Sequence, residues 1–492
     1  MISVLNPLPR LSGNKWLLLS AIFCLGFSLT SCELFKKLPD NDKVYKEDQT
    51  GLGEIQGPVT TDPVTGETQQ IYVLVEDVDT VQWTLSNPDK FPPIQSEATS
   101  ISDVVFPGGD PGDQVTGPRD GYNVSMVLPF FANQYNSMSA NVPANSSWAL
   151  QFYAGAKMAM EKLENEGARI NFNVLDSQGS EQKVQTLINS NGDLQQADLI
   201  IGPYRSSNAR LLADFAKREQ IFMVSPYSAN PFVTKENPYY LQLNPSLNAH
   251  CESITQHVMQ NYRPEQVILV ARNRVDEIER FQLFQQERIR LSQGLDTLAF
   301  QELIIRDESP ELIDLDILPY LNAEGPTVFI VPSYNDPNFI YSFLRKVRTG
   351  MIDFTEDVVI YGMPIWKQYE NIDYDLYEQL NVHISSATYI DEYNPDIQQF
   401  RREFFDLYGQ LPSEEAFMGF GTTLYFGRQL QQKGKSFYQQ LDTSDADLIH
   451  TQYQIRRVFK DPEQFNTSAI ERYENNFVHI LEFLDYYFQL AD

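Results

Sequence analysis

The sequence predicts an α/β protein of two lobes, each a parallel β-sheet with helices on both faces. Over residues 122–485, short and continuously apolar segments alternate with longer segments that have helical spacing. Strands that are apolar without interruption are buried on both faces, as in parallel sheets covered by helices. The alternation breaks near 240–246 and resumes, which predicts a second sheet, and a break near 388–395 predicts a return to the first. Two sheets joined by more than one crossover form a hinged clamshell.

Length and charge narrow the class of function. The chain has 492 residues, enough to bury more than one core, and its 66 acidic and 37 basic side chains give a formal charge of −29. A protein that binds nucleic acid needs a basic face to neutralise phosphates, so we expect no nucleic-acid partner. We expect the acidity to serve solubility.

The N-terminal segment has the form of an export signal. Arg10 and Lys15 precede an apolar run at 16–29, which is shorter than the ~20 residues of a membrane span. The run ends in Leu-Thr-Ser followed by Cys32, a pattern that resembles the bacterial lipobox. We therefore predict a signal peptide over 1–31 and a lipid on Cys32. The alternatives are an ordinary buried cysteine or cleavage by the general signal peptidase.

Lipidation would set both the location and the cysteine chemistry. Acyl chains on Cys32 would anchor the protein to a membrane. Glu33 is not the aspartate that commonly retains lipoproteins at the inner membrane, so we predict the outer membrane, facing the periplasm. Processing would remove Cys24 and leave Cys251 as the free thiol, so no disulfide is expected within the mature chain. The helical spacing around Cys251 indicates a core thiol.

Residues 32–121 are predicted to form an acidic tether rich in glycine and proline. No helical period is present there, and the composition favours an extended chain over a packed core. One stretch, 71–86, alternates enough to predict a short hairpin or a docking segment. A tether of this length would carry the folded domain away from the membrane.

The first lobe is predicted to comprise about 122–243 and 395–485, and the second about 247–390. The elements of the first are strand 122–128, helix 146–167, strand 169–177, helix 180–192, strand 197–203, helix 206–220, strand 221–228, helix 395–408, helix 414–432 and strand 477–484. The elements of the second are helix 247–261, strand 266–272, helix 276–291, strands 298–305 and 327–333, helix 336–347, and strands 357–364 and 381–390.

Polar and aromatic residues follow the carboxyl ends of several predicted strands. Ligands bind at these ends in open α/β sheets, because the loops diverge there and helix amino termini point inward. Gly202 and Pro203 end the third strand abruptly, and the hydroxyl of Ser206 can either face a ligand or only cap the next helix. The predicted ligand-binding residues are Phe130, Arg205, Ser206, Ser207, Tyr227, Ser228, Tyr334 and Trp366.

Sequence patterns of the common catalytic and metal sites are missing. The chain contains no His-Glu-x-x-His, no Gly-x-Ser-x-Gly and no Cys-x-x-Cys. The Gly-Lys-Ser at 434–436 lacks the earlier glycine of a phosphate-binding loop. His250 and His257 lie seven residues apart on one predicted helix. We expect these side chains to be partly buried and not to bind a metal ion. We therefore predict no catalytic residue, no metal and no cofactor.

Several segments resemble a known family. The stretches VSMVLPF, YAGAKMAMEKLENEG, DLIIGPYRSSNARLLADFAKREQIFMVSPYSAN and FMGFGTTLYFGRQL resemble the type I periplasmic solute-binding proteins of the leucine/isoleucine/valine-binding kind. They resemble about equally the outer-membrane lipoproteins that activate penicillin-binding proteins. The resemblance covers about 122–485 and implies that Ser206 and Ser228 hold a ligand carboxylate. The family's Tyr-Gly pair after the first strand of the second lobe is replaced by Arg272-Asn273-Arg274.

Two functions follow as expectations. The first is a lipid-anchored periplasmic protein that binds a small polar solute, amino-acid-like or other, between its lobes for transport or sensing. The second is a non-catalytic lipoprotein that regulates peptidoglycan synthesis by contact with a cell-wall synthesis protein. The partner is accordingly a small molecule or such a protein, and the membrane is reached through Cys32.

Overall fold

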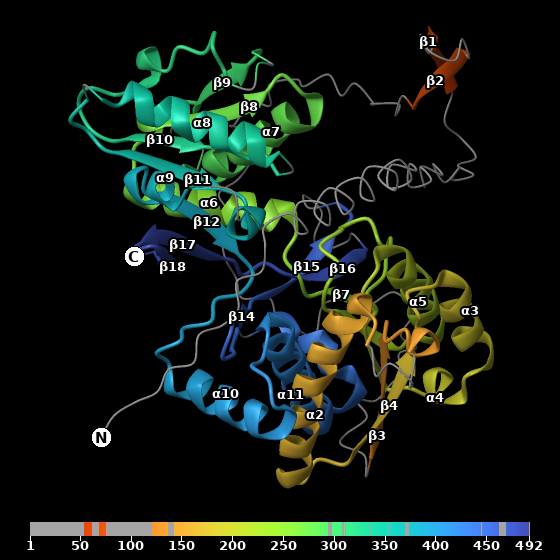
Figure 1. Ribbon diagram of the computed structural model, residues 1–492. Helices are drawn as coiled ribbons and strands as arrows, with labels where there is room; N and C mark the ends of the chain where they lie inside the picture. Colours follow the sequence, from red (N-terminus) through yellow and green to blue (C-terminus); the bar gives the residue numbers. More distant parts are fainter. Residues whose placement is uncertain are drawn as a thin grey trace, which may run out of the picture. The chain divides into compact units, whose positions relative to one another are not determined.

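In the computed structural model, the chain forms two compact units, Met1–Thr99 and Ser100–Asp492 (Figure 1). In the first unit the structure describes the backbone of 54–61 and 68–74. In the second it describes residues 121–135, 142–293, 298–307, 309, 311–334, 336–352, 354–369, 373–443, 445–461 and 469–491. The predicted signal peptide and Cys32 lie outside these ranges. Of the helices in these ranges, none combines the length and the apolar character that crossing a membrane requires.

The described part of the first unit is an antiparallel hairpin of β1 (Glu54–Thr61) and β2 (Thr68–Leu74). A short hairpin or a docking segment was predicted within 71–86 and no strand at 54–61, but β2 pairs with a strand at 54–61. The reason is Gly57-Pro58, which reads as a break in a strand. The register of the pair shifts between Gln56 and Val59, and such a bulge tolerates a proline because no ladder hydrogen bond is needed there.

The first sheet of the second unit has seven strands in the order β15-β16-β7-β6-β5-β3-β4. Its pairs are parallel except for the antiparallel pair of β15 with β16 at one edge. The strands are β3 (Tyr122–Leu128), β4 (Ile170–Asp176), β5 (Leu199–Ile201), β6 (Phe222–Ser225), β7 (Tyr240–Gln242), β15 (Ile455–Phe459) and β16 (Ile470–Asn475).

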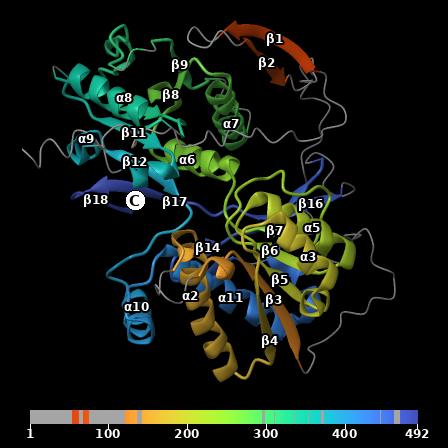
Figure 2. The ribbon, with the colours of Figure 1, turned by 45° about the vertical axis from the view of Figure 1, so that its right-hand side comes forward.

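Helices cover both faces of this sheet (Figures 1 and 2). Val124 of β3 packs into one core with Phe152 of α2, whereas Val127 packs into the opposite core with Leu212 of α5. Neighbouring strand residues point to opposite faces, so the uninterrupted apolar strands supply both cores. The helices are α2 (Ser147–Asn165), α3 (Glu181–Ser190), α4 (Gly192–Gln195), α5 (Ser206–Glu219), α10 (Pro395–Tyr408) and α11 (Glu414–Lys433).

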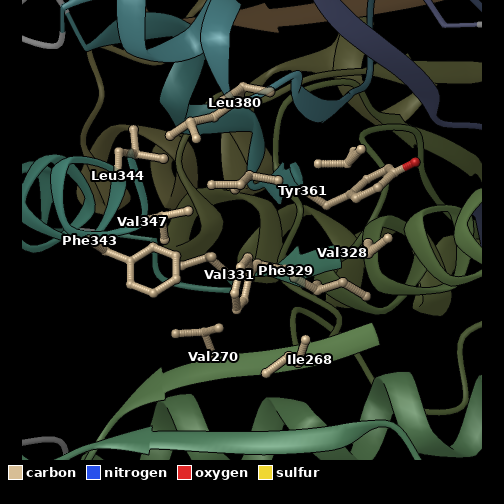
Figure 3. Packing of buried hydrophobic residues seen from close by; sticks show 14 of the residues in the cluster. Ile268, Val270, Val328, Phe329, Val331, Phe343, Leu344, Val347, Tyr361 and Leu380 are labelled. Atoms are coloured by element: carbon tan, nitrogen blue, oxygen red, sulfur yellow. The ribbon is translucent and has the colours of Figure 1, made fainter. Parts of the chain in front are cut away.

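The second sheet also has seven strands, in the order β18-β17-β12-β11-β10-β8-β9. Its core joins Val270 of β8 and Phe329 of β10 to Phe343 and Val347 of α8 (Figure 3). Cys251 of α6 is buried in the same core, as the sequence predicted. The strands are β8 (Val267–Arg272), β9 (Gln301–Ile305), β10 (Thr327–Ile330), β11 (Val358–Gly362), β12 (Val382–Ser386), β17 (His479–Leu484) and β18 (Tyr487–Leu490). The helices are α6 (Leu247–Asn261), α7 (Val275–Leu291), α8 (Pro337–Gly350) and α9 (Tyr374–Gln379).

The late strand at 477–484 was assigned to the wrong lobe. β17 does not return to the first sheet but lies antiparallel beside β12 of the second, with His383 opposite Glu482. The strands that do return are β15 and β16, which the sequence analysis did not predict because charged residues such as Arg456 interrupt their apolar pattern. The two lobes are therefore joined by three connections, at 243–246, 387–394 and 476–478.

Helices α2 and α11 lie in backbone contact in the first lobe (Figures 1 and 2). A Cβ atom on Gly155 would lie 1.9 Å from the carbonyl oxygen of Ala416, and one on Gly419 would lie 1.9 Å from that of Phe152. Only glycine permits this approach from either helix. The pair holds the amino end of α2, and therefore Trp148, over the carboxyl ends of the first sheet.

Candidate ligand-binding site

The loop after β5 is shaped by Gly202. Its φ of +117° suits glycine, and an added Cβ would lie 2.2 Å from the carbonyl oxygen of Val127 on β3. The chain then turns into α5, whose N-cap residue is Arg205 and not Ser206. No side chain caps this helix, so the helix-capping explanation for the Ser206 hydroxyl is wrong.

Two of the predicted site residues meet at the carboxyl ends of neighbouring strands. The hydroxyl of Ser206, after β5, lies 2.9 Å from that of Ser228, after β6. Ser228 is 4% exposed, and its oxygen also accepts a weak hydrogen bond from the backbone N–H of Asn230 at 3.4 Å. Ser206 is half-buried. Ser206 follows Tyr204 by two residues and Ser228 directly follows Tyr227, so the hydroxyl pair adjoins an aromatic wall in the chain.

That wall consists of three aromatic rings. The rings of Tyr204 and Tyr227 stack with centroids 4.0 Å apart, and their hydroxyls are hydrogen-bonded at 3.0 Å. Trp148, in the first turn of α2, sets its ring against both at 4.9 and 5.4 Å. Its buried indole N–H has no hydrogen-bond partner among the described residues. Trp148 and Tyr204 were not among the predicted ligand-binding residues, although an aromatic residue beside a strand end or a helix start was the available signal.

The electrostatics of Tyr227 keep it a neutral phenol. Burial raises the pKa of its hydroxyl well above the ordinary value, and the hydrogen bond with Tyr204 raises it further. Glu415 and Tyr334 are near enough to add to the shift. Tyr334 belongs to the second lobe, so one predicted residue of that lobe lies close to the aromatic wall. A neutral phenol can donate a hydrogen bond to a ligand at any physiological pH.

The loop after β3 is organised by Asp176, which the sequence analysis missed. Its carboxylate at the end of β4 accepts the backbone N–H groups of Phe130 at 2.9 Å, Phe131 at 3.2 Å and Ala132 at 3.0 Å. These amides are therefore occupied within the protein. The Phe130 side chain is half-buried, with its ring edge to Tyr153 at 5.7 Å.

The other two predicted residues of the first lobe are exposed. The Arg205 guanidinium donates to the carbonyl of Gly179 at 3.2 Å and has no acidic partner among the described residues. Ser207, on the first turn of α5, is also exposed. Both residues therefore flank Ser206 in the chain with their side chains exposed to solvent.

Trp366 does not belong to the site. Its side chain is 1% exposed, its indole N–H donates to the carbonyl of Ser333 at 3.2 Å, and its ring stacks on Tyr377. The ring rests on Gly362, where an added Cβ would approach it to 2.4 Å. The prediction that Trp366 walls a ligand pocket is wrong, because a glycine in β11 opens a space that draws the ring into the core.

The comparisons with known proteins agree with this architecture. Residues 142–276 match the sequence profile of a family described as periplasmic binding protein. The chain is similar in structure to a putative branched-chain amino acid ABC transporter protein from Rhodospirillum rubrum, with a TM-score of 0.52 and 15% identity over 75% of this chain and 100% of that one. A branched chain amino acid ABC transporter periplasmic ligand-binding protein from Burkholderia xenovorans gives a TM-score of 0.50 and 12% identity over 75% and 94%. No curated protein matches by sequence.

This is the fold of a type I periplasmic binding protein. The predicted fold class and the resemblance to that family are confirmed. Within the periplasmic-binding-protein fold, the described residues contain no cluster of three His, Cys, Asp or Glu side chains able to hold a metal ion.

The lobes of this periplasmic-binding-protein fold touch near their connections. The carboxylate of Glu414, at the start of α11, pairs with the Lys367 ammonium of the second lobe and accepts the Thr388 hydroxyl at 3.1 Å. The backbone N–H of Tyr389 donates to the carbonyl of His450 at 2.9 Å. Glu414 adjoins Glu415, which influences Tyr227, so the connection region and the aromatic wall are neighbours in the structure.

Proposed function

We propose that this protein is a periplasmic binding protein that reversibly binds a small polar solute at the Ser206 and Ser228 hydroxyls. The single observation that carries the proposal is their 2.9 Å contact, made by residues that lie close in the chain to Tyr204 and Tyr227 of the aromatic wall. Ligand pockets combine flat apolar walls with a few convergent polar groups, and this arrangement has both. The similar structures named above are described as branched-chain amino acid ABC transporter proteins. An amino-acid-like solute is therefore the first class to test.

The two hydroxyls would act as donors to one acceptor group of the solute. In the absence of ligand they satisfy each other. A carboxylate or carbonyl oxygen arriving between them would accept from both, and the neutral Tyr227 phenol would offer a further donor beside it. The cost of breaking the serine pair is repaid because hydrogen bonds to a charged acceptor are stronger than those between neutral groups.

Thermal-shift screening of the purified full chain tests this function. The panel contains amino acids, short peptides, nucleotides and muropeptides, because any ligand that binds only the folded state raises the midpoint of unfolding. Any hit is repeated with Ser206→Ala and Ser228→Ala, and with the exposed Ser207→Ala as the matched control. Stabilisation that is lost in the first two variants and kept in the third supports the serine site. Equal stabilisation of all four proteins contradicts it.

The alternative function, regulation of peptidoglycan synthesis by protein contact, is favoured by one feature. The two serine hydroxyls pair with each other, and the two tyrosine hydroxyls do the same, so these four groups have partners without a solute. Co-purification of a cell-wall synthesis protein, with no hit across the solute panel, would favour this alternative.

The proposed location is the outer membrane, facing the periplasm, with the lipid on Cys32 as anchor. The support is the lipobox-like Leu-Thr-Ser-Cys that follows the apolar run at 16–29. Cell fractionation of Cys32→Ala tests it, with Cys24→Ala as the control. Release of the first variant alone from the membrane fraction is the expected outcome, and unchanged membrane association of Cys32→Ala would refute the anchor.

A further inference from the structure

A second candidate site lies in the second lobe and shares no residue with the serine pair. A cavity of about 660 Å³ opens at the carboxyl ends of β8 and β9 beside the first turns of α8. Four arginines line it, Arg272, Arg274, Arg306 and Arg345, in a chain whose formal charge is −29. Strand ends of an open α/β sheet are places where ligands bind.

The first arginine of the lining, Arg272, is held in place by its ion pairs. Its guanidinium pairs with the carboxylates of Glu277 and Asp336 and lies over the Phe339 ring at 5.1 Å. Glu277 is 2% exposed and also accepts the backbone N–H of Arg272 at 2.9 Å and the Ser333 hydroxyl at 3.3 Å. The network holds the pKa of Glu277 below its ordinary value despite burial, through the hydrogen bonds from Arg272. Arg272 is therefore held by two carboxylates, and these three groups together carry a net charge of −1.

The other three arginines have no ion pair with any described residue. Arg274 and Arg306 are exposed at the ends of β8 and β9, and Arg345 lies on α8 with its guanidinium over the Tyr341 ring at 5.5 Å. All three line one cavity although acidic side chains outnumber basic ones in the chain by 66 to 37. The N–H donors of these three guanidinium groups are therefore free of any carboxylate partner among the described residues.

Two of the three carboxylates that line the cavity, those of Asp307 and Asp336, are held by other groups. The carboxylate of Asp307 accepts the backbone N–H groups of Ser309 and Asp314, each at 2.8 Å, and so holds its own loop. Asp336 is engaged by Arg272 and also caps α8 through the N–H of Phe339 at 3.0 Å. Among the described lining residues, Glu311 is the remaining carboxylate. The lining thus holds four guanidinium groups against three carboxylates, and three of those guanidinium groups have no ion pair with a described residue.

We propose that this cavity binds a small solute with at least two anionic oxygen groups, phosphate or carboxylate. Guanidinium groups present paired N–H donors that match such groups in a bidentate geometry, and three of them can engage two groups of one ligand. Tyr341 and Phe339 supply flat apolar surface beside the charges. The site goes beyond the proposed function, because the second lobe builds it alone.

Isothermal titration of the full chain in low-salt chloride buffer tests the proposal. Pyrophosphate and citrate are titrated separately, so that the two arms distinguish phosphate from carboxylate. The wild type should bind at least one with saturating, salt-sensitive affinity. Arg306→Gln and Arg345→Gln should each weaken it by about ten- to a hundred-fold, because each loses a charge-assisted contact.

Two controls separate this site from the serine pair and from general charge effects. Arg210→Gln removes an exposed arginine of α5 in the first lobe, and Ser228→Ala removes the proposed solute donor. Both should bind the anions like the wild type. The proposal is overturned if neither anion binds, if Arg306→Gln and Arg345→Gln bind like the wild type, or if Ser228→Ala alone abolishes binding. That last result would place the anion at the serine pair.

Discussion

The hydroxyl oxygens of Ser206 and Ser228 lie 2.9 Å apart, although 21 residues separate them along the chain. The contact exists because β5 and β6 are parallel neighbours, with Ile201 in register with Val224, so that their carboxyl ends meet at one edge of the sheet. A pair of this kind has a measurable consequence that does not depend on the identity of any ligand.

The stabilities of Ser206→Ala and Ser228→Ala should not add. Removing one hydroxyl leaves the other without its partner, whereas removing both removes the hydrogen bond and the unsatisfied group together. We expect a coupling of about 0.5–1 kcal/mol in the free energy of unfolding, with the double variant less destabilised than the sum. Urea unfolding of the four proteins measures it. Strict additivity would show that the two hydroxyls do not interact in solution.

The close contact of α2 with α11 predicts a large effect of one methyl group. Gly155→Ala or Gly419→Ala would place a Cβ 1.9 Å from a carbonyl oxygen of the facing helix, so the helices must separate. We expect each to lower the free energy of unfolding by about 1–3 kcal/mol or more. Gly192→Ala, at a helical glycine with nothing within 4 Å of the added Cβ, is the matched control and should be close to neutral. Equal stabilities of the three variants would contradict the helix contact.

The burial of Trp366 predicts an effect on stability and not on ligand contact. Trp366→Ala should cost about 3–5 kcal/mol, because it empties a large space in the core of the second lobe. Tyr393→Ala, which removes an aromatic side chain that is 79% exposed, should change stability by less than about 0.5 kcal/mol. Denaturant midpoints distinguish the two. A near-neutral Trp366→Ala would return this residue to the candidate site.

Buried histidines predict that mild acid destabilises the fold. Burial lowers the pKa of His250 from 6.5 to about 4, and it lowers that of His450 to about 3, with His479 as a smaller cause. Between about pH 6.5 and 4 the unfolded chain binds protons that the folded chain does not. The free energy of unfolding therefore falls as pH is lowered, by up to ~1.4 kcal/mol per pH unit for each such group.

Urea midpoints at pH 7.5, 6.5 and 5.5 check this slope, a range chosen because it lies above the ordinary range of carboxyl titration. His450→Asn removes one titrating group, so its stability should depend less steeply on pH than that of the wild type. An unchanged slope in this variant would mean that His450 is protonated, or accessible to protons, in the folded state.

Much of the fold could be predicted because its signals are local. Helix α6 begins and ends where its apolar spacing predicted, at Leu247 and Asn261, and the continuous apolar strands indicated sheets covered on both faces. The same signals could not tell which sheet the strand at 477–484 joins. Its pattern shows that it is a strand, but its partner depends on where an unpaired sheet edge lies, which is the edge of β12.

The candidate site, too, could be predicted from the sequence only in part. The sequence by itself determined that hydroxyl and aromatic side chains follow the strand ends, because glycine, proline and the helix start at Ser206 are readable in order along the chain. Only the tertiary structure decided which of them converge: Ser206 with Ser228, and Trp148 with two tyrosines. It also decided that Trp366 lies in the core, since the space above Gly362 is a property of packing between elements far apart in sequence.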